Sequence, residues 1–144
     1  MSLPFAFWDS SALIPLCVTQ PQSQSSKALF RKYSIAVWWA TEVEIQSGLT
    51  RLERMGNIPH SQCLSSKRLA ANLVSGWLSV HESTAITSDA CSLLEVYPLS
   101  AADALQLAAA LEVCAHKPHG YVFVTGDQRL ADAARQAGFT VEFV

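Results

Sequence analysis

Short apolar runs alternate with longer amphipathic segments along this chain. The short runs are rich in aromatic and β-branched residues and are bounded by Asp, Ser, Gly or Pro, a pattern typical of buried strands. The predicted strands cover residues 5–8, 35–39, 79–81, 121–125 and 139–144.

The segments between these runs have apolar residues at helical spacing, with recognisable start and stop residues. Pro59 suits the first turn of a helix, Pro98 stops another, and Gly138 ends the last one. Residues 19–26 are polar and of low complexity, and we predict that this stretch opens as a loop. The predicted helices cover residues 11–18, 27–33, 41–55, 59–77, 87–97, 100–116 and 128–137.

Strands that alternate with helices indicate βαβ units and parallel pairing. The chain has 144 residues, of which 50% are hydrophobic and 15% charged, enough to bury one core. We therefore predict an α/β fold: a three-layer α/β/α sandwich with a mainly parallel, roughly five-stranded sheet, formed by a single domain over residues 1–144.

Two acidic residues lie in the first turns of predicted helices. Asp103 follows Ser100 by three residues, and Glu44 follows Thr41 by three, which is the spacing of a capping box. An acid in this position also interacts favourably with the helix dipole. A purely local role therefore suffices to explain each of them.

Two further acids, Asp9 and Asp127, follow directly on predicted strands. Each has a local explanation too, as the cap of the next helix. However, the ligand crevice of an open parallel sheet lies outside the carboxyl ends of its strands, so all four acids can converge there. Clustered carboxylates repel one another unless a cation neutralises them, and Mg²⁺ prefers such oxygen ligands.

The net charge and the lengths of the apolar runs bear on the partners and the location of the protein. A net charge of −2 weighs against a broad electrostatic attraction to nucleic acid, although a local basic patch remains compatible with it. No apolar run approaches the ~20 residues of a membrane span, and the first residues lack the pattern of a signal peptide. We expect a cytoplasmic protein without a membrane anchor.

Cysteine and histidine residues show no zinc-site spacing. The four cysteines are scattered, without a CxxC pair, and are expected to be buried free thiols. The four histidines form no ligand motif and are expected on the surface or in loops. The cysteines are Cys17, Cys63, Cys91 and Cys114, and the histidines are His60, His81, His116 and His119.

Four segments together resemble the PIN domain family, and within it the VapC-type toxin ribonucleases. The segment WDSSAL (8–13) is similar to the opening motif and places its acid at Asp9. VEIQSGL (43–49) and ADALQLA (102–108) are similar to the next two motifs and place acids at Glu44 and Asp103. VTGDQRL (124–130) is similar to the last and gives Asp127. The resemblance covers nearly the whole chain.

The resemblance implies a PIN-like fold and a Mg²⁺- or Mn²⁺-dependent endoribonuclease that cleaves RNA phosphodiesters with metal-activated water. In such enzymes the four acids hold the metal. Ser10 and Thr125 would contact metal waters or phosphate. The resemblance also implies a homodimer, an antitoxin protein as partner, and a role as the toxin of a type II toxin–antitoxin pair.

Two positions depart from the family pattern. Glu42 is a second acid near Glu44, but a helix places the two on different faces, so we expect only Glu44 to bind metal. Relatives often have a histidine where this chain has Gln106, and we expect little consequence for metal binding.

Basic residues are candidates for contacts with substrate phosphates, although a solvated basic face explains them equally well. Trp38 and Trp39 are expected in the core or a dimer interface rather than as a stacking platform for bases. The candidate basic residues are Arg51, Arg54, Arg129, Lys67 and Arg68.

Two alternatives remain open. One is a PIN-fold module that binds RNA or protein with little or no nuclease activity. The other is a phosphotransferase of the haloacid-dehalogenase or receiver type, but Ser10 and Ser11 follow Asp9 where the former expects a second aspartate.

Overall fold

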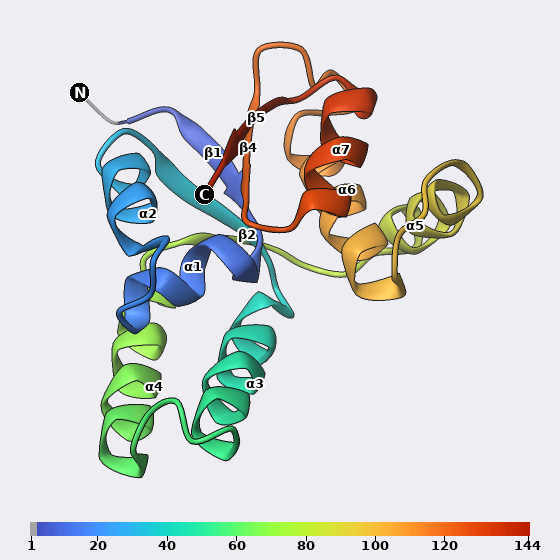
Figure 1. Ribbon diagram of the computed structural model, residues 1–144. Coiled ribbons are helices and arrows are strands. Elements are labelled where there is room, and N and C mark those ends of the chain that lie inside the picture. Colours follow the sequence, from blue (N-terminus) through green and yellow to red (C-terminus); the bar gives the residue numbers. More distant parts are fainter. Residues whose placement is uncertain (1–2) are drawn as a thin grey trace.

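A five-stranded, all-parallel sheet forms the centre of the molecule. The computed structural model describes residues 3–144, and its strand order is β3-β2-β1-β4-β5 (Figure 1). This confirms the predicted α/β class and strand number. The strands are β1 (Phe5–Trp8), β2 (Ser34–Trp38), β3 (Leu78–Val80), β4 (Val122–Thr125) and β5 (Thr140–Phe143).

Helices cover both faces of this sheet, as the three-layer prediction requires. In Figure 1, α1 to α4 lie to one side of the strands and α5 to α7 to the other. The helices are α1 (Ser10–Cys17), α2 (Ser23–Phe30), α3 (Thr41–Arg54), α4 (His60–Val74), α5 (Thr84–Val96), α6 (Ala101–Val113) and α7 (Gln128–Ala137).

The alternation of side chains along each strand divides the interior into two cores. On β1, Phe7 faces the core formed with α5, α6 and α7, while Ala6 and Trp8 face the core formed with α1 to α4. On β4, Phe123 and Val124 divide in the same way. Strands buried on both faces explain why their sequences are continuous apolar runs.

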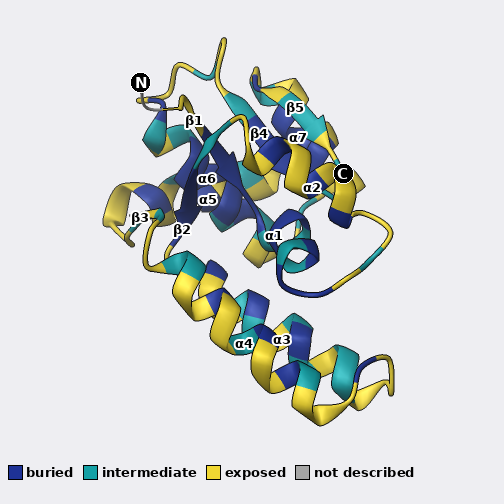
Figure 2. Cartoon of the chain, turned by 90° about the vertical axis from the view of Figure 1, so that its left-hand side faces the viewer, coloured by how far each residue is buried: buried dark blue, intermediate teal, exposed yellow. Residues whose placement is uncertain are grey.

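Helices α3 and α4 form a pair that extends away from the sheet (Figures 1 and 2). Gly48 lies where α3 passes α1, and a Cβ there would collide with the side chain of Ile14. The glycine therefore permits close packing between the middle of α3 and α1. Exposed side chains cover the outer surface of the pair (Figure 2).

Several predicted helix boundaries were wrong by three or four residues: both ends of α2, the end of α4, the start of α5 and the end of α6. Two of these differences have a local cause in the structure. Helix α2 begins at Ser23, inside the polar stretch predicted as a loop, because the Ser23 hydroxyl accepts from the N–H of Gln20 and donates to the Pro15 carbonyl. Helix α6 ends at Val113, short of His116, because Ala115 and His116 adopt positive φ values of 51° and 59°.

The strand order fixes where a ligand crevice can lie. From β1 the chain builds outward to β2 and β3, then returns to place β4 and β5 on the other side of β1. The order therefore reverses between β1 and β4, which is the topological switch point of such a sheet. Trp8 pairs with Val124, so the residues after them leave the sheet at the same level.

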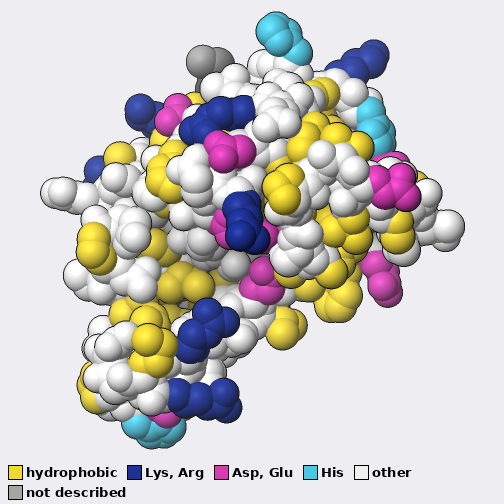
Figure 3. All heavy atoms as spheres, turned by 45° about the vertical axis from the view of Figure 1, so that its right-hand side comes forward, with side chains coloured by type: hydrophobic (Ala, Val, Ile, Leu, Met, Phe, Trp, Pro, Cys, Tyr) yellow, Lys and Arg dark blue, Asp and Glu magenta, His cyan; other side chains and the backbone are white. Residues whose placement is uncertain are grey.

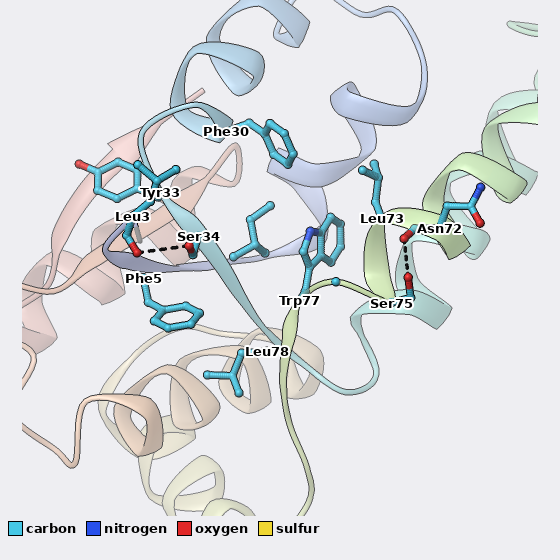
Figure 4. A pocket seen from close by; sticks show the side chains of 12 residues that line it. Leu3, Phe5, Phe30, Tyr33, Ser34, Asn72, Leu73, Ser75, Trp77 and Leu78 are labelled. Atoms are coloured by element: carbon cyan, nitrogen blue, oxygen red, sulfur yellow. Dashed lines mark hydrogen bonds between the residues drawn. The ribbon is translucent and has the colours of Figure 1, made fainter. Parts of the chain in front are cut away.

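A hollow of about 660 Å³ lies at the opposite end of the sheet (Figure 4). Its lining includes Phe5, Ser34 and Leu78, the first residues of β1, β2 and β3, together with Tyr33 and Trp77. Among the described residues, no charged side chain lines it. It therefore lacks the groups needed for acid–base or metal chemistry.

Three of the predicted free thiols are buried, but Cys91 is exposed on α5, contrary to the prediction. Only one side of α5 packs on α6, so a cysteine on the other side meets solvent. None of the helices in residues 3–144 has the length and apolar character needed to cross a membrane.

Candidate metal and catalytic site

Asp9 lies at the carboxyl end of β1, at the switch point of the sheet. Its N–H donates to the Val124 carbonyl at 3.2 Å, which continues the ladder between β1 and β4 by one residue. The side chain is only 4% exposed, and its Oδ1 accepts a 2.6 Å hydrogen bond from the Ser11 hydroxyl. Asp9 occupies the cap position of α1 but makes no side-chain cap bond, so capping does not explain it.

Ser11 joins Asp9 to the segment after β4. Its Oγ accepts a 2.7 Å hydrogen bond from the N–H of Gly126 and lies 3.3 Å from Oγ1 of Thr125. The sequence prediction chose Ser10 and missed Ser11. Ser10 and Ser11 are adjacent and both come just after Asp9. Only the fold shows which of them faces β4.

Asp127 follows β4 and begins α7. Its Oδ1 accepts from the N–H of Leu130 at 3.0 Å, so its local role as a helix cap is real. Its own N–H donates to Oγ1 of Thr125 at 3.0 Å. The hydroxyl of Thr125 is thus held between Ser11 and Asp127 and links the two acids that leave neighbouring strands.

Glu44 enters the site from the first turn of α3. Its Oε2 accepts from the Ser10 hydroxyl at 3.3 Å, and its Oε1 accepts from Nε2 of Gln106 at 2.9 Å. The predicted capping box was wrong, because the cap residue is Ala40 and Thr41 is fully buried inside the helix. The Thr41 hydroxyl instead accepts from the same Gln106 amide at 3.1 Å.

Asp103 enters from the first turn of α6. As predicted, Ser100 caps this helix, and its hydroxyl accepts from the N–H of Asp103 at 3.2 Å. The Asp103 carboxylate is half-buried, and its hydrogen bond with Ser100 opposes the rise of its pKa. A carboxylate has two oxygens with several lone pairs, so it can still bind a ligand.

The effects of these acids on one another's pKa values show that they lie close together. Burial raises the pKa of Asp9 to about 7, with the charges of Asp127 and Asp103 adding to the rise and the hydroxyls of Ser11 and Thr125 opposing it. Burial raises the pKa of Asp103 as well, reinforced by the charge of Asp127. The Ser100 hydrogen bond and the charge of Arg129 oppose the rise at Asp103, but burial and repulsion between the acids outweigh them.

Glu44 shares this environment. Burial raises its pKa, the hydrogen bonds from Gln106 and Ser10 lower it, and the charge of Asp103 raises it. Across residues 3–144, no Lys, Arg or His nitrogen lies within 4.0 Å of an oxygen of the four acids. An all-oxygen site without a cationic side chain fits a hard divalent cation such as Mg²⁺.

The oxygen atoms of the four acids are not gathered tightly enough to form a preformed metal-ligand cluster. Within the described part of the chain, only Asp89, Glu112 and His116 bring three ligand atoms within 4.8 Å of one another. Mg²⁺ keeps several waters and uses one or two carboxylates directly, so a loose arrangement of acids suits it.

The tighter group lies elsewhere, at the far end of α6. Nε2 of His116 is 3.3 Å from Asp89 and 3.7 Å from Glu112, and all three side chains are partly exposed. Glu112 is nine residues beyond Asp103, about 13 Å along the helix. Any metal measurement must distinguish this group from the acids around Asp9.

The candidate basic residues lie at different distances from the four acids. Arg51 lines a groove of about 520 Å³ together with Glu44 and Ser10, and the charge of Arg129 acts on Asp103. Arg54 is exposed further along α3. Figure 3 shows Lys and Arg side chains beside acidic ones on one face of the molecule.

The two adjacent tryptophans differ. Trp38 is 4% exposed and belongs to the core, as predicted. Trp39, after the end of β2, is 42% exposed and does not belong to the core. Glu42 is exposed, whereas Glu44 faces the site, in agreement with the expected helix faces.

No model of a known protein family matches the sequence, and no curated protein matches it either. Solved structures do match. A toxin–antitoxin complex from Klebsiella pneumoniae aligns with a TM-score of 0.63 at 17% identity, over 88% of this chain and 90% of that one. PAE2754 from Pyrobaculum aerophilum aligns with a TM-score of 0.67 at 19% identity, over 96% and 89%.

The sarcin-ricin loop cleaving toxin VapC20 from Mycobacterium tuberculosis aligns with a TM-score of 0.66 at 17% identity, over 94% of this chain and 96% of that one. The chain has the PIN-domain fold. The resemblance seen in the sequence motifs is thereby confirmed at the level of the fold.

In this PIN fold, the sequence did not predict a role at the site for two polar residues, Ser11 and Gln106. Ser11 was overlooked in favour of its neighbour, and Gln106 was expected to have little consequence. The available signal for Gln106 was its spacing, because a residue three positions after Asp103 lies on the same helix face.

Proposed function

We propose that this protein is a divalent-metal-dependent endoribonuclease that cleaves RNA phosphodiesters, and that it is the toxin of a type II toxin–antitoxin pair. The observation that carries the proposal is the meeting of four carboxylates at the switch point, none of which forms an ion pair within 4.0 Å in residues 3–144. Asp9 and Asp127 follow β1 and β4, and Glu44 and Asp103 lie in the first turns of α3 and α6, so no single local cap explains their convergence.

Asp9, Glu44, Asp103 and Asp127 would hold Mg²⁺ or Mn²⁺. Such an ion activates water and stabilises charge that develops on a phosphoryl oxygen. Asp9 is the central ligand, since its buried carboxylate is fixed by Ser11. The hydroxyls of Ser10 and Thr125 are already engaged with Glu44 and with the N–H of Asp127, so we assign them to the positioning of these acids.

The substrate would approach past the basic residues. Arg51 borders the groove next to Glu44 and Arg129 lies near Asp103, so both can contact phosphates beside the scissile bond. Arg54, further along α3, would contact a more distant phosphate. The structural neighbours include a toxin–antitoxin complex and a toxin that cleaves the sarcin-ricin loop, which supports RNA as substrate and an antitoxin as partner.

The deciding experiment is a titration of Mn²⁺ or Mg²⁺ into the full chain, with RNA cleavage and thermal shift read together. Asp9→Asn and Asp103→Asn should each reduce cleavage more than about 100-fold while the far-UV circular dichroism stays unchanged. The matched control is His116→Gln, which removes one ligand of the Asp89–Glu112–His116 group and should leave cleavage unchanged.

Each result has a distinct meaning. A metal response that persists in His116→Gln and disappears in Asp9→Asn assigns the ion to the acid site. Metal binding without cleavage of any RNA favours the binding-module alternative. Full cleavage by Asp9→Asn and Asp103→Asn would overturn the proposal.

A further inference from the structure

Gln106 is a polar residue placed deep inside the molecule. It lies in the middle of α6, is 1% exposed, and comes three residues after Asp103. Its amide nitrogen donates two hydrogen bonds to the first turn of α3, to Oε1 of Glu44 at 2.9 Å and to Oγ1 of Thr41 at 3.1 Å. Both N–H groups of the amide are therefore directed at one helix.

Packing does not explain this residue. The Oε1 atom of Gln106 is buried and has no hydrogen-bond partner within the described residues. A buried acceptor without a partner costs free energy that an apolar side chain of equal size would not. The position is surrounded by Ala and Leu residues of the core, which favour such an apolar side chain. Departures of this kind concentrate at functional sites.

The hydrogen bonds of Glu44 show what the amide does. Gln106 holds one carboxylate oxygen from α6, and Ser10 holds the other from the start of α1. Glu44 is only half-buried, so without the stronger of these two bonds its side chain can rotate into solvent. Each oxygen keeps a lone pair for a further ligand.

We propose that Gln106 is a positioning residue that fixes the Glu44 carboxylate for metal binding. This inference rests on the proposed function, because it assigns Glu44 to the metal. The fully buried Thr41 completes the arrangement, since its hydroxyl holds the amide in the orientation that presents an N–H to Glu44. Residues that orient a metal ligand commonly affect affinity by 10- to 100-fold.

The first test is Gln106→Met, which keeps the side-chain length and removes the amide. We expect Mn²⁺ affinity, measured by calorimetry, to fall by about 10- to 100-fold, while the melting temperature of the metal-free protein stays equal or rises. RNA cleavage should fall at low Mn²⁺ and recover at high Mn²⁺. A residue with a merely structural role would lower the melting temperature, and added Mn²⁺ would not restore its cleavage.

The matched control is Gln46→Met on α3. The Gln46 amide donates to the Lys67 carbonyl at 3.4 Å, away from the four acids. This variant loses the same chemical group from the same helix that carries Glu44. Its Mn²⁺ affinity and cleavage should equal those of the wild type.

A double-mutant cycle tests whether Gln106 acts through Glu44. In a Glu44→Gln background, Gln106→Met should cause no further loss of Mn²⁺ affinity, because the group being positioned is already gone. Additive losses would overturn the inference, as would wild-type Mn²⁺ affinity in Gln106→Met. If Gln106→Met does not fold, Gln106→Leu serves for the same measurements.

Failure of this inference is distinguishable from failure of the proposed function. If the wild type binds and uses Mn²⁺ and Asp9→Asn does not, the site stands whatever Gln106 does. If the wild type neither binds Mn²⁺ nor cleaves RNA, the site assignment fails first, and this inference with it.

Discussion

Replacement of Asp9 by Asn should stabilise the metal-free protein at neutral and alkaline pH. Most substitutions of buried residues destabilise a fold, so the expected sign is unusual. The reason is the environment of this carboxylate, which is 4% exposed, lies near the charges of Asp103 and Asp127, and has no cationic partner within residues 3–144. Asn has the same shape and can still accept the hydrogen bond from Ser11.

The magnitude follows from the shifted pKa. The pKa of Asp9 rises from 3.8 to about 7, and at 1.36 kcal/mol per pH unit this difference costs the ionised folded state roughly 4 kcal/mol. The amide of Asn brings an N–H₂ group that needs its own partners, which offsets part of the gain. We expect a net stabilisation of about 2–3 kcal/mol at pH 8, or about 6–9 °C in melting temperature.

The pH dependence has a defined direction. Because the pKa of Asp9 is raised by folding, the folded state binds more protons between about pH 4 and pH 7. The contribution of Asp9 to stability is therefore present below pH 4 and is lost as the pH rises through 7. Asn does not titrate, so the stability of the variant relative to the wild type should rise continuously between pH 4 and pH 7 and level off by pH 8.

The assay is urea unfolding of both proteins in EDTA at several pH values, followed by the same series with Mg²⁺. Subtraction of one curve from the other cancels the titration of all other groups. Mg²⁺ should stabilise the wild type and leave the variant unchanged, which closes the gap at pH 8. A variant that is less stable than the wild type at pH 8, or a difference that does not vary with pH, would refute the reasoning.

Two other substitutions test the connections around Asp9 and Asp127. Ser11→Ala leaves the N–H of Gly126 without its acceptor and should lower the free energy of unfolding by about 1–3 kcal/mol, as measured by urea unfolding; an unchanged stability would contradict the linking role of Ser11. Asp127→Ala should lose about 1 kcal/mol of helix-cap stability, whereas Asp127→Asn keeps the cap. If Asp127 also holds metal, both variants lose RNA cleavage. Full cleavage by Asp127→Asn would limit this residue to capping.

The sequence by itself determined the strands, the helices and the parallel sheet. Apolar runs and helical spacing are local signals, so the strand at 121–125 and the helix at 128–137 lie within one residue of β4 and α7. Ser100 was correctly predicted as a cap for the same reason, because its partner is only three residues away. The four acids could be singled out because each lies in a recognisable local context.

Only the tertiary structure decided which side chains meet. Gln106 and Glu44 are 62 residues apart, and Ser11 and Gly126 are 115 apart, so no local pattern contains either contact. Thr41 has the spacing of a capping residue, yet the fold buries its hydroxyl against the amide of Gln106 in α6. Local periodicity specifies the elements, whereas the hydrogen bonds that shape the site depend on how distant elements pack across the sheet.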